Sequence, residues 1–125
     1  ELQACIHSVR MLYPGRYVLG VFQPHLFTRT RDFADDFAQV LSSLDEVTLL
    51  PIYPAREEPI VGITSEWLLR KVHTKRALLY SPTVLPKFLH ERVKRLLAEG
   101  KDCVVVTMGA GDIDRYTNEI TTKLL

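Results

Sequence analysis

The chain has little of what would place it outside ordinary globular proteins. Its 125 residues contain only 2 cysteines, and no apolar run approaches the roughly 20 residues that span a bilayer. Lys and Arg number 16 against 15 Asp and Glu, so the net charge is +1. The one-signed basic surface typical of nucleic-acid binders is therefore missing. We expect neither nucleic acid nor a membrane as a partner.

The opening residues and the cysteines add two further exclusions. The chain begins polar and helical in pattern, without the apolar stretch of a signal peptide. Cys5 and Cys103 lie far apart and form no Cys-x-x-Cys pair, which favours reduced thiols in a cytosolic protein and leaves a single disulfide open. No histidine spacing predicts a metal site. Because the chain opens with Glu1 rather than Met, we expect a piece of a longer protein.

What the sequence does contain is an ordinary globular composition, 46% hydrophobic and 25% charged. Its length predicts one domain over residues 1–125. Four apolar runs rich in β-branched and aromatic residues predict strands that are covered on both faces. These runs are Tyr17–Phe22, Val47–Tyr53, Arg76–Tyr80 and Cys103–Met108.

Apolar residues at helical spacing lie before, between and after these runs. The predicted helices are an opening helix that ends before Pro14, and helices over Phe33–Leu44, Trp67–Val72, Val84–Leu97 and Ile113–Leu124. Asp32, Thr64 or Ser65, and Asp112 are the expected N-caps, and Gly100 is expected to end the fourth helix. The alternation predicts an α/β fold: an open, mostly parallel, twisted sheet of strand order 3-2-1-4, Rossmann-like, with helices on both faces.

Ligands of such sheets bind beyond the carboxyl ends of the strands. Residues 23–31 follow the first strand and bring His25, Arg29 and Arg31 close together in sequence. An arginine can grip a carboxylate with two parallel hydrogen bonds, and a histidine can bond an amine. Surface ion pairs with the aspartates at 32, 35 and 36 are an equally good interpretation of both arginines.

A glycine-rich turn, Gly109-Ala110-Gly111, follows the last strand and precedes a helix. Backbone amides at such a helix start favour an anion. The alternative is a tight turn that needs glycine for its backbone angles. The turn matches neither the dinucleotide-binding fingerprint nor a phosphate-binding P-loop.

Three stretches resemble the UDP-N-acetylmuramate–L-alanine ligases of the Mur ligase family. Phe22–Asp32 is similar to the family's F-Q-P-H-R-Y-T-R-T-R-D, Tyr53–Gly62 to its Y-x-A-G-E-x-P-I-x-G, and Thr107–Ile113 to its T-M-G-A-G-D-I. The three occur in the family's order, and the resemblance extends over essentially the whole chain.

The resemblance implies the C-terminal, amino-acid-binding domain of a three-domain, ADP-forming ligase of the bacterial cytoplasm. In that family ATP phosphorylates the lactyl carboxylate of UDP-N-acetylmuramate, and the amine of L-alanine attacks the acyl phosphate in peptidoglycan biosynthesis. ATP, magnesium and the sugar nucleotide are bound mainly by the other two domains, so no cofactor is expected on this chain. The isolated domain is expected to be inactive.

The resemblance also implies roles for particular residues. Arg29 would hold the alanine carboxylate, and His25 would line the amino-acid site. The turn residues Gly109, Ala110, Gly111 and Asp112 are implied to face the same cleft. Arg56 and Glu57 are implied to reach it through a loop that contacts the amino acid in sibling ligases. No catalytic residue or metal ligand is assigned.

The sequence departs from the family pattern at two places. Leu26 and Phe27 stand where the family usually has Arg-Tyr, and Arg56 stands where it often has glycine. Two alternatives stay open: a related ligase that adds a tripeptide to the same sugar nucleotide, and a stand-alone α/β module that binds a small anion or a nucleotide.

Overall fold

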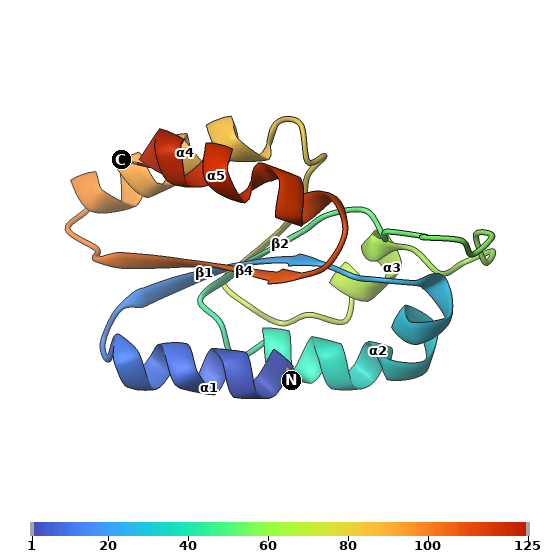
Figure 1. The fold of residues 1–125 in the computed structure, drawn as a ribbon. Coiled ribbons are helices and arrows are strands. Elements are labelled where there is room, and N and C mark those ends of the chain that lie inside the picture. Colours follow the sequence, from blue (N-terminus) through green and yellow to red (C-terminus); the bar gives the residue numbers. More distant parts are fainter. Residues whose placement is uncertain (1, 125) are drawn as a thin grey trace.

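The computed structural model describes residues 2–124, in which helices and strands alternate (Figure 1). The elements are α1 (Leu2–Leu12), β1 (Tyr17–Gln23), α2 (Phe27–Leu41), β2 (Glu46–Leu49), α3 (Ser65–Leu69), β3 (Arg76–Leu79), α4 (Leu85–Ala98), β4 (Cys103–Gly109) and α5 (Asp112–Leu124).

The strands form one parallel sheet in the order β3-β2-β1-β4. This confirms the predicted α/β class, parallel pairing and strand order. Strand β1 is central, with Gly20 opposite Val47 of β2 and Val106 of β4. Parallel strands share a direction, so the carboxyl ends of β1 and β4 meet at one edge of the sheet.

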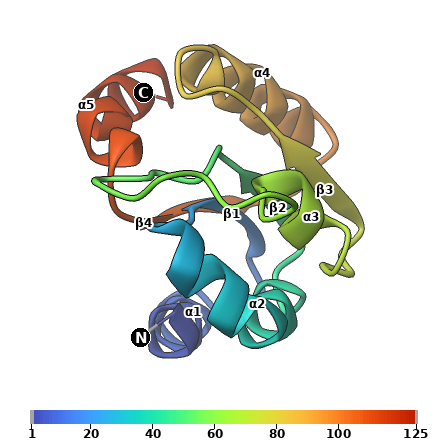
Figure 2. The ribbon, with the colours of Figure 1, turned by 90° about the vertical axis from the view of Figure 1, so that its right-hand side faces the viewer.

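Two helical layers cover the sheet (Figure 2). Helices α1, α2 and α3 pack on one face, where Val18 and Phe22 of β1 point. Helices α4 and α5 pack on the other face, where Val21 points. This alternation of neighbouring side chains explains why the strands are apolar throughout rather than at every second residue.

Helix α2 begins earlier than predicted. It starts at Phe27, so the expectation that Asp32 caps it is wrong; Asp32 lies inside the helix and pairs with Arg31 at 2.8 Å. The backbone leaves helical angles at Phe33 (φ −114°, ψ 15°). The apolar pattern predicted only the part of the helix from this kink onward, because the first turn lacks core-facing apolar spacing. By contrast, Thr64 caps α3 as expected, by accepting a hydrogen bond from the Trp67 amide.

Strand β2 is shorter than the predicted Val47–Tyr53 and ends at Leu49. The Leu50 amide still donates to the Phe22 carbonyl at 3.0 Å, but Pro51, the next residue, has no amide hydrogen to continue the pairing. Tyr53 instead makes an isolated parallel bridge to His25, beyond the end of β1.

A buried ion cluster lies at the opposite, amino-terminal end of the strands. The Glu46 side chain is 5% exposed and accepts hydrogen bonds from the Tyr17 hydroxyl (2.8 Å) and from Arg92 Nε (3.0 Å). Arg76 lies 3.8 Å from the same carboxylate. Burial, together with the bond to Glu46, raises the pKa of Tyr17 to about 12. This cluster joins β1, β2, β3 and α4 and is structural in character.

Candidate functional site

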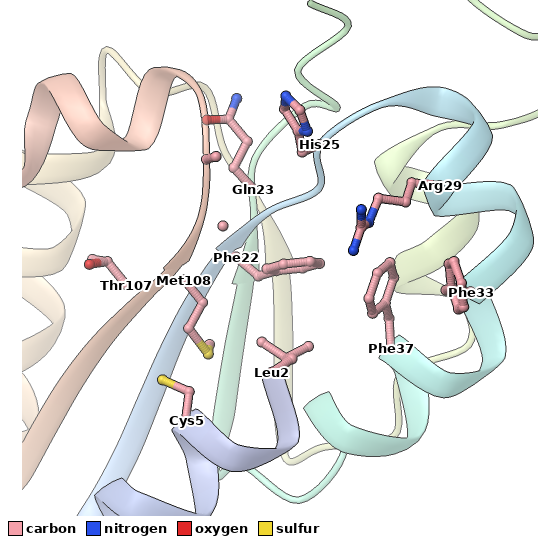
Figure 3. Close-up of a pocket in the computed structure, with 12 residues that line it drawn as sticks. Leu2, Cys5, Phe22, Gln23, His25, Arg29, Phe33, Phe37, Thr107 and Met108 are labelled. Atoms are coloured by element: carbon pink, nitrogen blue, oxygen red, sulfur yellow. The ribbon is translucent and has the colours of Figure 1, made fainter.

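A cavity of about 740 Å³ opens at the carboxyl ends of β1 and β4, between the sheet and helices α1 and α2 (Figure 3). Polar and backbone groups line one part of it and apolar side chains the other. The lining residues are Leu2, Cys5, Phe22, Gln23, His25, Arg29, Phe33, Phe37, Thr107, Met108, Gly109 and Ala110.

Arg29 comes from the first turn of α2 and turns its guanidinium into the cavity, toward Phe22 and Phe37 (Figure 3). Within residues 2–124 no carboxylate lies within 4.0 Å of that guanidinium. The alternative interpretation as a surface ion pair therefore holds for Arg31, which pairs with Asp32, but not for Arg29. Of the cavity-lining residues that the structure describes, Arg29 is the one with a permanent charge.

His25 lies at the cavity beside Gln23 (Figure 3) and is half-buried. Its ring stacks on that of Tyr53, with centroids 5.9 Å apart and an interplanar angle of 13°. The next residue, Leu26, has φ 71°, a region that residues with side chains rarely adopt. Its amide donates to the Tyr53 carbonyl at 2.8 Å. Strained backbone of this kind persists where surrounding contacts enforce it, and it is concentrated at functional sites.

The glycine turn needs its glycines for space as well as for backbone angles. A Cβ on Gly109 (φ +104°) would lie 2.2 Å from the Gln23 carbonyl oxygen, and a Cβ on Gly111 (φ +118°) would lie 2.4 Å from Cγ of Tyr53. Gly111 thus packs against the ring that also supports His25. The tight-turn interpretation explains both glycines without requiring an anion.

Gln23 joins this turn to the rest of the rim. Its buried amide group donates to the Pro51 carbonyl (3.1 Å) and to Asp112 (3.2 Å). Its oxygen accepts from the Ile113 amide at 2.8 Å. One of the amides at the start of α5 is therefore already satisfied within the protein.

The structure brings four of the eight predicted site residues into the cavity: His25, Arg29, Gly109 and Ala110. Gly111 and Asp112 lie behind them, against Tyr53 and Gln23. Arg56 is exposed on the following loop and Glu57 binds Thr28, and neither lines the cavity. A direct contact with an amino acid stays a prediction for all eight residues.

Sequence reasoning missed the apolar part of the cavity. Leu2 and Cys5 come from α1, and Phe33 and Phe37 from α2. The spacing of Phe33 and Phe37 predicted that both lie on the apolar face of a helix. The sequence pattern does not distinguish an apolar face that packs completely from one that leaves a cavity. Among residues 2–124, no cluster of three or more His, Cys, Asp or Glu side chains could hold a metal ion. None of the helices described has both the length and the apolarity of a membrane span.

The structure is an α/β domain with a cavity at the carboxyl edge of its sheet, lined by an arginine that has no carboxylate within 4.0 Å among residues 2–124. Comparison with known proteins makes this class specific. The chain is 52% identical over 126 aligned residues to the UDP-N-acetylmuramate–L-alanine ligase of Christiangramia forsetii, covering 100% of this chain and 26% of the relative. It is 50% identical over 115 residues to the ligase of that name from Porphyromonas gingivalis, covering 92% and 24%. The chain belongs to this ligase family and corresponds to its C-terminal region.

The chain spans about a quarter of the length of the curated relatives it matches. No protein-family model matches it.

Proposed function

We propose that this chain is the amino-acid-binding domain of a three-domain ligase that joins L-alanine to UDP-N-acetylmuramate at the expense of ATP. The observation that carries the proposal is Arg29: a cation without a carboxylate partner in residues 2–124, turned into a cavity at the ligand-binding edge of the sheet. The relatives are named as L-alanine ligases, which favours L-alanine over the tripeptide alternative.

In this proposal Arg29 binds the carboxylate of alanine through its planar, two-pronged set of donors. His25 lies on the same cavity and is placed to accept a hydrogen bond from the ammonium group or to donate one to the forming intermediate. Contacts at both ends of the amino acid hold it beside the acyl phosphate, so that the bound alanine is present at a high effective concentration.

The remaining steps belong to the rest of the enzyme. ATP phosphorylates the lactyl carboxylate of the sugar nucleotide and leaves as ADP; magnesium stabilises the charge of that transfer. The amine of alanine attacks the carbonyl carbon of the acyl phosphate, loses a proton, and displaces inorganic phosphate to leave the amide. Closure of this domain over the ATP-binding domain excludes the water that would hydrolyse the acyl phosphate. The proposed location is the bacterial cytoplasm.

The test is an assay of ADP release by the full-length protein and by residues 1–125 alone. The full-length protein is expected to release ADP only when UDP-N-acetylmuramate and L-alanine are both present, and residues 1–125 are expected to release none. ADP release by the fragment, or ADP release by the full-length protein at the same rate with and without L-alanine, would contradict the proposal.

A further inference from the structure

The loop that follows β2 holds the segment that carries His25 and Arg29. Tyr53 donates its amide to the Pro24 carbonyl and accepts the Leu26 amide at its own carbonyl, both at 2.8 Å. These two bonds grip the backbone on either side of His25. They also enforce the positive φ of Leu26 that turns the chain from β1 into α2.

The same loop caps helix α2. Leu26, the N-cap residue, has no side-chain oxygen and caps nothing. Glu57 takes this part from 29 residues away: its carboxylate accepts the Thr28 amide at 3.0 Å and a short hydrogen bond from the Thr28 hydroxyl. The hydroxyl bond holds the pKa of Glu57 below its usual value, against an opposing effect of desolvation. A carboxylate on a first-turn amide is a favourable N-terminal cap.

The loop makes a defined turn between Tyr53 and Glu57. Ala55 adopts φ 53°, and the Glu57 amide closes a turn onto the Pro54 carbonyl at 2.9 Å. This turn brings Tyr53 and Glu57 onto the same segment, residues 24–28, to which both are hydrogen-bonded. Arg29 directly follows Thr28, so the capped first turn sets the position of the Arg29 backbone, from which the side chain extends into the cavity.

We propose that Glu57 is a positioning residue of the amino-acid site, which sets the place of Arg29 through Thr28, and that it does not bind the amino acid itself. This inference rests on the proposed function, because it assigns Arg29 to the alanine carboxylate. It replaces the direct contact that the family resemblance implies for Glu57.

A double-mutant cycle in the full-length ligase tests it, with the KM for alanine and kcat measured for Arg29→Ala, Glu57→Ala and the double variant. Glu57→Ala is expected to raise the KM about tenfold, equivalent to about 1.4 kcal/mol, with kcat unchanged. In the Arg29→Ala background it is expected to change the KM by less than about twofold, since residues that act as a unit are not additive. Glu58→Ala, the neighbouring exposed glutamate, is the matched control and is expected to match the wild type.

An equal rise in the KM with and without Arg29 would show that Glu57 acts on alanine directly and would overturn the inference. So would a Glu57→Ala enzyme with an unchanged KM. An unchanged KM in Arg29→Ala alone would instead refute the carboxylate site of the proposed function.

A second pair of variants guards against simple misfolding. Thr28→Ser keeps the hydroxyl that Glu57 accepts, whereas Thr28→Val is of nearly the same size and lacks it. We expect a wild-type KM for Thr28→Ser and a raised KM for Thr28→Val, with Tm unchanged between the two. Equal values of the KM for both variants would show that the Thr28 hydroxyl does not link Glu57 to Arg29, and would overturn the inference.

Discussion

Replacing Arg29 by alanine in the full-length ligase should weaken the binding of alanine and leave the chemistry intact. The guanidinium lies in the cavity with no carboxylate of residues 2–124 within 4.0 Å, so its charge is available to a ligand. A hydrogen bond to a charged group contributes about 1.5–3 kcal/mol, which corresponds to a rise of roughly ten- to hundredfold in the KM for alanine. Because this bond is made equally in the ground state and the transition state, kcat should change little.

Arg31→Ala is the matched control for this substitution. Arg31 lies two residues further along the same helix, but it pairs with Asp32 at 2.8 Å and does not line the cavity. Exposed pairs of this kind contribute little, so its KM should stay within about twofold of the wild type. Steady-state kinetics with alanine varied and the other substrates saturating provide the measurement. Equal effects of the two substitutions, or a fall in kcat without a change in the KM, would refute the reasoning.

Three further predictions concern residues 1–125 themselves. Glu46→Ala should lower the free energy of unfolding by about 1.5–3 kcal/mol in urea titration, because it removes the charged hydrogen bonds of the half-buried Arg92; a loss below about 1 kcal/mol would contradict a structural role for the cluster. The pKa of Tyr17 is raised to about 12, so the stability that Tyr17 contributes is fully present below about pH 10, its unfolded pKa, and is lost as the pH rises toward 12; Tyr17→Phe should remove this alkaline decline in Tm. Gly111→Ala should destabilise the fold by about 1–3 kcal/mol more than Gly62→Ala, since both glycines have positive φ but only the former would place its Cβ against Tyr53; equal losses would show that backbone strain alone decides.

The sequence predicted the layout of the fold well because the signals for it are local. Strands buried on both faces read as continuous apolar runs, helices as stripes, and their alternation restricts the topology to a few possibilities. The carboxyl ends of the strands then indicated where a ligand binds, and Arg29 and Gly109 do lie on one cavity there. These inferences require only neighbouring residues and general rules of chain geometry.

Where prediction failed, the determining contacts are long-range. The start of α2 is capped by Glu57, 29 residues away, so no local motif marks Phe27 as the first helical residue. Glu46 can be buried because Arg92, 46 residues later in the chain, donates hydrogen bonds to its carboxylate. The apolar side of the cavity depends on how closely α1 packs against α2, which side-chain spacing does not specify. Each of these features depends on a partner that only the folded chain brings near.

The central claim is that Arg29 recognises the carboxylate of the amino acid, and changing the substrate tests it most directly. The measurement compares kcat/KM for L-alanine with that for L-alaninamide, which keeps the amine and methyl group but lacks the negative charge, in the wild-type ligase and in Arg29→Ala. We predict that the wild type prefers alanine by at least about tenfold and that Arg29→Ala loses most of this preference. A preference for alanine that survives unchanged in Arg29→Ala would contradict the account.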